Sequence, residues 1–448
     1  MTALTASPEH PSITVTARSP MEARYHTLLH GRPGEGLEWL QEQLLLADAL
    51  PDDLPGDPAQ LGPWSSYRAG EVARAYAAYL AGRKAGACRR YFSNRAHALY
   101  FLQHVAPTKA VDGAWLAGTL RHWPDPRFHG LIRTYLEELG DGDPACNHVL
   151  IFQRLLSELG CHEPLPLSAD RYLQGCVQLA LGLNTDALLP EVIGYNLGYE
   201  QPPLHLLITA FELDELGIDP QYFRLHVTID NASSGHACKA LHALQQVWPE
   251  HGSTPFYQRV SRGYRLNDLG PGALAIIDSF DLETELLAAL ERKRSFGQHM
   301  HSDYCRFEGR TVNQWLAEPD LLSGFLAVLQ RKGWIKRHQD PAHSRFWHLI
   351  DGPAAAMFGV FSPFEKQLLH DWIADNWTPA AGQRQAPAAK VEPVSDDAQG
   401  QALEAVLQTL PPEARVELLI EEMAGNRHAL PRGLWAARRF ARMTGLSR

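Results

Sequence analysis

Apolar residues recur at helical spacing along most of the chain. They stand three and four positions apart in segments 37–46, 72–80 and 96–104. That is the period of an amphipathic helix, whereas the alternation typical of strands is nearly absent before residue 290. Pro and Gly clusters such as 51–58 separate these segments without resembling hairpin turns. The pattern predicts an all-α fold, with a helical bundle over residues 21–290.

The pattern changes after the bundle. A helix is predicted over residues 322–332, where Gly333 follows the last apolar position. Residues 334–350 alternate around a polar turn, which predicts a β-hairpin. We therefore expect an extension made of a helix and a β-hairpin over residues 291–378.

Three further segments lack the pattern of a packed core or stand apart from it. Residues 1–20 mix Thr, Ser, Pro and charge without periodicity, which is typical of a mobile N-terminal arm. Residues 379–401 are rich in Pro, Ala and Gln and are typical of a linker. Residues 402–448 contain amphipathic stretches split by prolines, which indicates a C-terminal helical tail.

Composition and charge narrow the class of protein. The 448 residues are 45% hydrophobic and 21% charged, as in soluble chains with more than one domain. A net charge of −10 would repel a phosphate backbone, so nucleic acid is not an expected partner. No stretch approaches the roughly 18 apolar residues of a membrane span, and the N-terminus has no apolar signal core. We expect a cytoplasmic protein without a membrane partner.

The six cysteines are dispersed, and no pair has the spacing of a zinc knuckle. A thiolate metal site and a disulfide framework are therefore disfavoured. The 21 histidines are the suggestive feature of the composition. Three segments concentrate carboxylates, and two of these also contain histidine.

The first segment spans residues 135–148. Glu138 and His148 are ten positions apart with two glycines and Pro144 between them, so a bent chain must bring them together. Asp141 would share a face with His148 on a straight helix, but Pro144 disfavours such a helix. We prefer Glu138 as the ligand, with Asp141 as the alternative.

The second segment spans residues 189–200. Glu191 and Glu200 are nine positions apart and cannot both face one centre on a regular helix. Glu200 follows Tyr199 and comes just before a Pro-Pro break, which can open a helix toward a ligand. Glu191 is equally explained as a first-turn carboxylate stabilised by helix amides. We favour Glu200 and keep Glu191 as the alternative.

The third segment contains His226 and Asp230, which are four positions apart and so project from one helical face. There an imidazole nitrogen and a carboxylate oxygen can meet one ion. The flanking residues are apolar, so the helix is expected to be buried, and a buried Asp needs compensation such as a cation. His236 lies six residues after Asp230, and Ser-Ser-Gly before it gives a reason for a local bulge or unwinding that could restore it to that face.

Together these segments resemble the heme-oxygenase-like diiron oxidases and oxygenases, also described as iron-containing redox enzymes. The most specific pieces are Glu-Glu-Leu-Gly-Asp-Gly with the later Asn-His, and Asp-Asn-Ala-Ser-Ser-Gly-His. The similarity covers roughly residues 90–250. The resemblance implies a helical bundle and a metal site whose ligands are Glu138, His148, Glu200, His226, Asp230 and His236.

The resemblance also implies two Fe²⁺ ions per chain, with dioxygen as co-substrate. The expected reactions are N-oxygenation, desaturation or oxidative carbon–carbon cleavage of a small amine or amino-acid-like molecule. Tyr199 and Arg224 are the candidate catalytic residues: Tyr199 as a hydrogen-bond donor near the metals, and Arg224 as a partner for a substrate carboxylate. The alternatives are aromatic packing for Tyr199 and, for Arg224, exposure to solvent or a pair with Asp214 or Glu215.

An external electron donor and a homodimer are compatible with this interpretation. The alternative from another class is a metal-free helical scaffold of the same fold that binds a partner. Iron content after purification separates the two.

Overall fold

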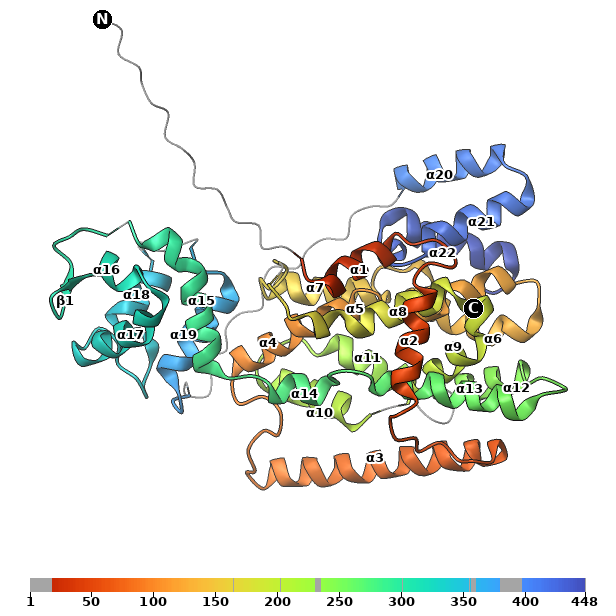
Figure 1. The fold of residues 1–448 in the computed structure, drawn as a ribbon, viewed down its shortest axis with the longest axis horizontal. Helices are drawn as coiled ribbons and strands as arrows, with labels where there is room; N and C mark the ends of the chain where they lie inside the picture. The colour runs from red at the N-terminus through yellow and green to blue at the C-terminus, as the bar shows by residue number, and fades with distance from the viewer. Residues whose placement is uncertain are drawn as a thin grey trace, which may run out of the picture.

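Helices dominate the computed structural model of the chain (Figure 1). The model describes residues 18–447 except 164, 202, 230–234, 300, 354, 356–359 and 379–396. Among the described residues the only strands are two short ones, which confirms the predicted all-α class.

The described residues of the main bundle form fourteen α-helices in chain order. They are α1 (Pro20–Leu29), α2 (Leu37–Ala47), α3 (Leu61–Lys84), α4 (Arg95–His104), α5 (Ala106–Lys109), α6 (His129–Glu138), α7 (His148–Glu158), α8 (Leu173–Leu183), α9 (Thr185–Tyr199), α10 (Leu204–Glu215), α11 (Gln221–Ile229), α12 (His236–Gln246), α13 (Ser253–Arg265) and α14 (Ala273–Asp278). Two 3-10 helices matter for the site: η2 (Ala114–His122) and η4 (Gly140–Gly142).

A smaller unit lies at one end of the molecule, on the left of Figure 1. Its elements are α15 (Leu282–Gly297), β1 (Arg306–Phe307), β2 (Arg310–Thr311), α16 (Val312–Leu316), α17 (Leu322–Arg331), α18 (Arg345–Asp351) and α19 (Pro363–Ala374). The two strands pair antiparallel, with Arg306 opposite Thr311. The Asp371 carboxylate accepts a hydrogen bond of 2.7 Å from the Ala96 N–H, which ties this unit to α4.

The C-terminal helices return to the opposite end of the bundle (Figure 1). They are α20 (Asp397–Thr409), α21 (Pro412–Met423) and α22 (Pro431–Thr444), with the 3-10 helix η9 (Arg427–Ala429) before the last one. The expected helical tail is therefore present. It packs into the same core as α6, α8 and α9.

The β-hairpin predicted for residues 334–350 is wrong in its position. This segment forms a 3-10 turn at Pro341–His343 and then α18. Asp340 caps the turn by accepting from the Ala342 N–H. Phe346 and Ile350 are both buried because, four residues apart, they share one helical face. The strands lie earlier in the chain, at β1 and β2.

Other expected boundaries differ from the helices by several residues. The boundary at 290 falls inside α15, which packs against α17 and α19 and so belongs with the extension. The expected arm over 1–20 lies outside the described residues up to 17, and Ser19 already caps α1 by accepting from the Glu22 N–H. The expected linker over 379–401 lies outside them up to 396, and α20 begins at Asp397.

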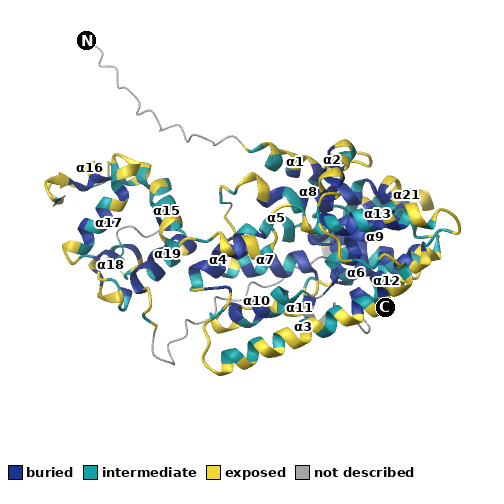
Figure 2. Ribbon diagram, turned by 60° about the horizontal axis from the view of Figure 1, so that its bottom comes forward, coloured by how far each residue is buried: buried dark blue, intermediate teal, exposed yellow. Residues whose placement is uncertain are grey.

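The buried apolar residues form two separate cores. The first joins α1, α2, α6, α8, α9, α12 and α13 with the C-terminal helices. The second joins α4, α7, α10 and α11 with the smaller unit. Figure 2 shows the buried residues as a dark interior, with exposed positions along the outer side of α3. Helices α6 and α9 belong to the first core, and α7 and α11 belong to the second. The boundary between the two cores, called the seam below, therefore runs between α6 and α7 and between α9 and α11.

The lengths and compositions of the helices bear on whether the chain could cross a membrane. Within the part of the chain that the structure describes, no helix combines the length and the apolar composition that crossing a membrane requires.

Candidate metal centre

Four buried side chains converge at the seam between the two cores. They are Asp112, Glu138, His148 and His226, and each offers a ligand atom within 4.8 Å of the others. The Nδ1 atom of His148 lies 2.5 Å from the Glu138 carboxylate, and Nε2 of His226 lies 3.2 Å from that of Asp112. We call this group the Asp112 cluster.

A second group shares one of these residues. Glu138, Glu200 and His236 also place ligand atoms within 4.8 Å of one another, and all three are buried. Nδ1 of His236 lies 3.1 Å from the Glu200 carboxylate and 3.3 Å from that of Glu138. We call this group the His236 cluster. Glu138 therefore stands between two sets of donors.

The tight connection between α6 and α7 brings Glu138 and His148 together. Helix α6 ends at Glu138, and positive φ angles of 63°, 54° and 81° at Gly140, Asp141 and Gly142 reverse the chain. A Cβ atom on Gly140 would lie 2.5 Å from the Asn147 nitrogen, so this close approach requires glycine. The expected bend between the two ligands is thus built from left-handed residues.

Hydroxyl groups hold Asp112 in place. The Tyr199 hydroxyl donates to one carboxylate oxygen at 2.6 Å, and the Tyr222 hydroxyl donates to the other at 2.5 Å. Lys109 donates to the Tyr199 hydroxyl oxygen at 2.8 Å. Burial, followed by the Asp112 charge, raises the pKa of both tyrosines well above their ordinary value. Both hydroxyls therefore remain protonated donors to Asp112.

The Asp112 carboxyl stays ionised in this setting. Burial alone would raise its pKa, but the charge of Lys109 and the hydrogen bond with His226 outweigh burial and lower it. Glu138 behaves similarly, since the attraction of His148 outweighs burial and lowers its pKa. Both carboxylates are thus available as anionic ligands.

A carboxylate supports His236 from the other side. Nε2 of His236 lies 2.8 Å from the Glu137 carboxylate, which also accepts from Lys239 at 2.5 Å. Burial would raise the pKa of Glu137, but the hydrogen bonds from these two partners lower it to about 2. An ionised Glu137 keeps the proton of His236 on Nε2, so Nδ1 faces Glu138 and Glu200.

The structure brings together five of the six ligands predicted from the sequence: Glu138, His148, Glu200, His226 and His236. The sixth, Asp230, lies outside the described residues. His236 is the first residue of α12, whereas His226 lies on α11, so the two come from different helices and not from one bulged helix.

The alternative carboxylates are paired elsewhere. Glu191 accepts two hydrogen bonds from Arg259, at 2.7 and 2.6 Å. Asp141 accepts from Arg133 at 2.5 Å. Neither belongs to a cluster, which agrees with the preference for Glu200 and Glu138.

The two candidate catalytic residues differ in their position relative to the Asp112 cluster. Tyr199 lies beside the Asp112 cluster, where it combines its hydrogen bond with packing of its ring against Trp115 at 4.4 Å between centroids. Arg224 does not reach the site, because its side chain is 59% exposed and pairs with Asp214 at 3.4 Å. Two positions from His226 is a rotation of about 200° on a helix, so Arg224 lies on the opposite face of α11.

Asp112 is the member that the sequence interpretation missed. It lies in the apolar segment between Val111 and Trp115 and is fully buried. The neighbouring Gly113 was the available signal: a Cβ atom there would lie 2.9 Å from the Cβ of Glu138. A buried Asp beside a glycine that allows close packing is the local signature of this ligand.

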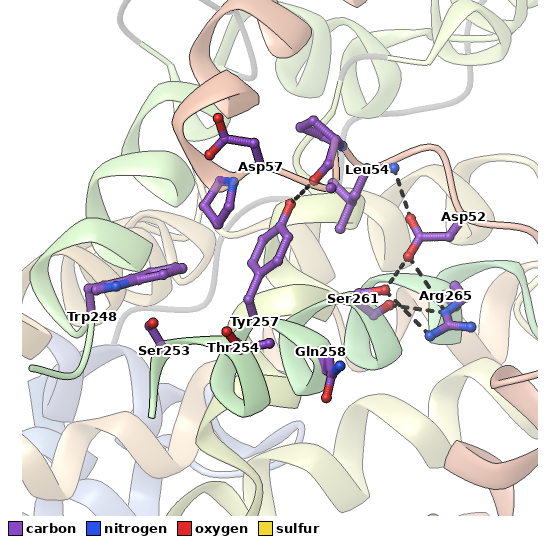
Figure 3. A pocket seen from close by; sticks show the side chains of 13 residues that line it. Asp52, Leu54, Asp57, Trp248, Ser253, Thr254, Tyr257, Gln258, Ser261 and Arg265 are labelled. Atoms are coloured by element: carbon purple, nitrogen blue, oxygen red, sulfur yellow. Dashed lines mark hydrogen bonds and ion pairs between the residues drawn. The ribbon is translucent and has the colours of Figure 1, made fainter. Parts of the chain in front are cut away.

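Two surface cavities of the described residues have linings without any member of the clusters. One cavity of about 560 Å³ lies between residues 52–58 and α13, and its lining contains no cluster member (Figure 3). Its polar groups pair with one another: the Tyr257 hydroxyl donates to the Pro55 carbonyl at 2.6 Å, and Arg265 lies 3.8 Å from Asp52. This cavity offers no group of convergent, unused ligands.

Comparison with known proteins finds a similarity to iron-containing enzymes. Residues 99–267 match the family model described as iron-containing redox enzyme. A search of the curated proteins and one of the solved structures gave no match. The matched residues include every member of both clusters, and the helical architecture is consistent with a heme-oxygenase-like fold. Residues 99–267 are therefore similar to the iron-containing redox enzymes, the family that the sequence resembles.

Proposed function

We propose that this protein is a non-heme diiron oxidase or oxygenase that uses dioxygen to oxidise a small amine or amino-acid-like substrate. The family of residues 99–267 supports the oxidoreductase role. The observation that carries the diiron part is the pair of buried donor groups that meet at Glu138.

The charges at the clusters fit a pair of divalent cations. Asp112, Glu138 and Glu200 are buried at 0%, 2% and 2% exposure. The Lys109 ammonium group lies 4.0 Å from the Asp112 carboxylate. Buried charges cost several kcal/mol each unless a partner compensates them. Imidazole and carboxylate donors suit iron, so two ferrous ions would supply that compensation.

In this proposal the donors of the two clusters divide between two ions. Asp112, His148 and His226 would hold one ion, Glu200 and His236 would hold the other, and Glu138 would serve both. When bound, the iron pair would supply the redox chemistry and the place where dioxygen is activated. The tyrosine hydroxyls at Asp112 and the Glu137 carboxylate at His236 orient ligands, which is the usual task of groups behind a metal ligand.

The substrate class comes from the resemblance and not from a pocket in the described residues. N-oxygenation, desaturation and carbon–carbon cleavage differ in the number of electrons that the substrate provides. An external electron donor is required wherever the substrate provides fewer than dioxygen accepts. The three reactions also give different products, so identification of the product distinguishes them.

Oxygen uptake by iron-loaded protein tests the proposal. Protein loaded anaerobically with Fe²⁺ would be mixed with oxygen and a panel of amines and amino acids, and products would be identified by mass spectrometry. We expect one class to accelerate oxygen uptake and to gain an oxygen atom, lose two hydrogen atoms or lose a carbon fragment.

Glu191→Gln is the matched control, because Glu191 is a buried carboxylate on α9 that pairs with Arg259 and not with the clusters. It should keep the activity, whereas Glu200→Gln should lose it. A wild-type protein that takes up no iron would reject the diiron assignment. Iron uptake without acceleration by any compound would reject the substrate class.

A further inference from the structure

The C-terminal segment packs against the turn that joins Glu138 to His148. The Tyr135 hydroxyl donates to the Met423 carbonyl at 2.5 Å, and Arg438 donates to the carbonyl of Gly142. A Cβ atom on Gly142 would collide with the Leu434 carbonyl oxygen. Residues far outside the matched family segment therefore lie directly over the α6–α7 connection.

This packing buries one histidine completely. His428 in η9 is 0% exposed, and its ring centroid lies 6.4 Å from that of Tyr135, one turn of α6 before Glu138. The charges of Glu138 and Asp112 raise its pKa and that of His148 lowers it, although burial dominates and lowers the value to about 4. The neutral ring of His428 thus lies in the electrostatic field of the Asp112 cluster.

The cap of α7 fixes which nitrogen of His428 carries the proton. Asn147 is the N-cap residue, and its Oδ1 accepts from the Leu150 N–H at 3.0 Å. Its amide nitrogen must then face the other way, where it lies 3.1 Å from Nδ1 of His428 and 3.3 Å from the Leu139 carbonyl. An amide N–H can only donate, so Nδ1 accepts and the proton resides on Nε2.

The Nε2–H group has no acceptor among the described residues. A buried donor without an acceptor costs about 1–3 kcal/mol, so a ligand that accepts from this N–H group would remove that cost. The neighbouring cluster is where a small exogenous ligand would bind.

We propose that the Nε2–H group of His428 donates a hydrogen bond to a small anionic or oxygen-donor ligand bound at the Asp112 cluster. The C-terminal segment then contributes a positioning residue to the centre that residues 99–267 build. This inference rests on the proposed diiron function.

Azide binding to the ferric-loaded protein provides the test, with azide as the probe and the visible absorption band as the readout. His428→Gln keeps a donor at the ε position and loses the contact with Asn147, whereas His428→Asn keeps that contact and loses the ε donor. We expect azide affinity near the wild-type value for Gln and about tenfold weaker for Asn, with iron content unchanged in both.

His97→Asn is the matched control. His97 is a buried histidine of α4 whose ring nitrogens both have partners, the Ser93 N–H at 3.3 Å and the Ile277 carbonyl at 2.8 Å. It should leave azide affinity unchanged even where it lowers stability.

Several outcomes would overturn the inference. Equal azide affinity in all variants would show that His428 does not contact the bound ligand. Weakening in Gln and not in Asn would show that His428 acts only through Asn147. Loss of one iron in both variants would make His428 a ligand and not a donor. Wild-type protein without iron would reject the proposed function, and the inference with it.

A second measurement does not depend on the variants folding. Nitrogen NMR of metal-free protein with labelled histidine reports the tautomer of each ring. We expect His428 to be the Nε2–H tautomer at neutral pH. The Nδ1–H tautomer would contradict the assignment.

Discussion

The Asp112 cluster and the His236 cluster meet at one carboxylate but are supported differently. Among the described residues, the Asp112 cluster has two imidazoles, and two tyrosine hydroxyls hold Asp112 from behind. The His236 cluster has one imidazole, held by Glu137, and lies closer to the surface through Lys239, which is 34% exposed.

If the clusters hold the proposed iron pair, this difference predicts two unequal metal positions. More imidazole donors and more rigid support favour tighter binding, because less ordering remains to be done when the ion arrives. We expect the position at the Asp112 cluster to fill first and the position at the His236 cluster to lose its ion more readily.

The largest effect is expected at the shared residue. Glu138→Ala should reduce iron from about two ions per chain to nearly none, because both positions lose a ligand. Iron content per chain, measured by elemental analysis, checks this. Asp141→Asn, three residues later and paired with Arg133, is the control that should keep both ions. Two ions retained in Glu138→Ala would show that the clusters do not share a ligand.

Single-histidine variants should separate the clusters. His226→Ala should remove the ion of the Asp112 cluster, and His236→Ala that of the His236 cluster, leaving about one ion per chain in each case. Because the first position is expected to bind more tightly, the remaining ion in His236→Ala should resist a chelator longer than the one in His226→Ala. The reverse order of chelator resistance would contradict the predicted inequality.

The supporting groups should have smaller effects. Tyr222→Phe removes one donor to Asp112, and Glu137→Gln removes the charge behind His236. Each should weaken the ion on its own side by about 10–100-fold and leave the other side unchanged. Metal titration of the two variants checks this, and an equal loss at both positions in either variant would argue against separate support.

The smallest effect concerns pH in the metal-free protein. The pKa of His428 is lowered to about 4, mainly by burial, from an ordinary value of 6.5. Between these values the unfolded chain binds a proton that the folded chain does not, so the free energy of unfolding falls as the pH decreases. His428→Gln should lose less stability than wild type over this range in urea unfolding. An identical pH dependence in both proteins would contradict a neutral, buried His428.

Glu137 titrates in a separate range. Its pKa is lowered to about 2 from an ordinary value of 4.5, so its contribution is present above about 4.5 and is lost below it. The pH range from 4.5 to 6.5 therefore isolates His428 from this carboxylate.

The sequence predicted those parts of the site that depend on local pattern. Helical periodicity gave the bundle, and the residues around Glu138 and His148 contained the glycines that their bend requires. Glu200, which was preferred over Glu191, directly follows α9 and lies in the His236 cluster, whereas Glu191 pairs with Arg259.

Parts that depend on packing between distant segments could not be predicted in this way. No spacing rule links Asp112 to His226, because they meet only when the turn before η2 comes together with α11 across the seam between the cores. Arg224 was placed at the site although its position on α11 points it to the opposite face from His226. His428 lies in a tail whose docking on α6 and α7 no local motif indicates.

Anomalous diffraction at the iron absorption edge, from crystals of iron-loaded protein, tests the central claim most directly. The account predicts two iron peaks, one among Asp112, His148 and His226 and the other beside Glu200 and His236, with Glu138 in contact with both. A single peak, or iron bound away from Glu138, would contradict it.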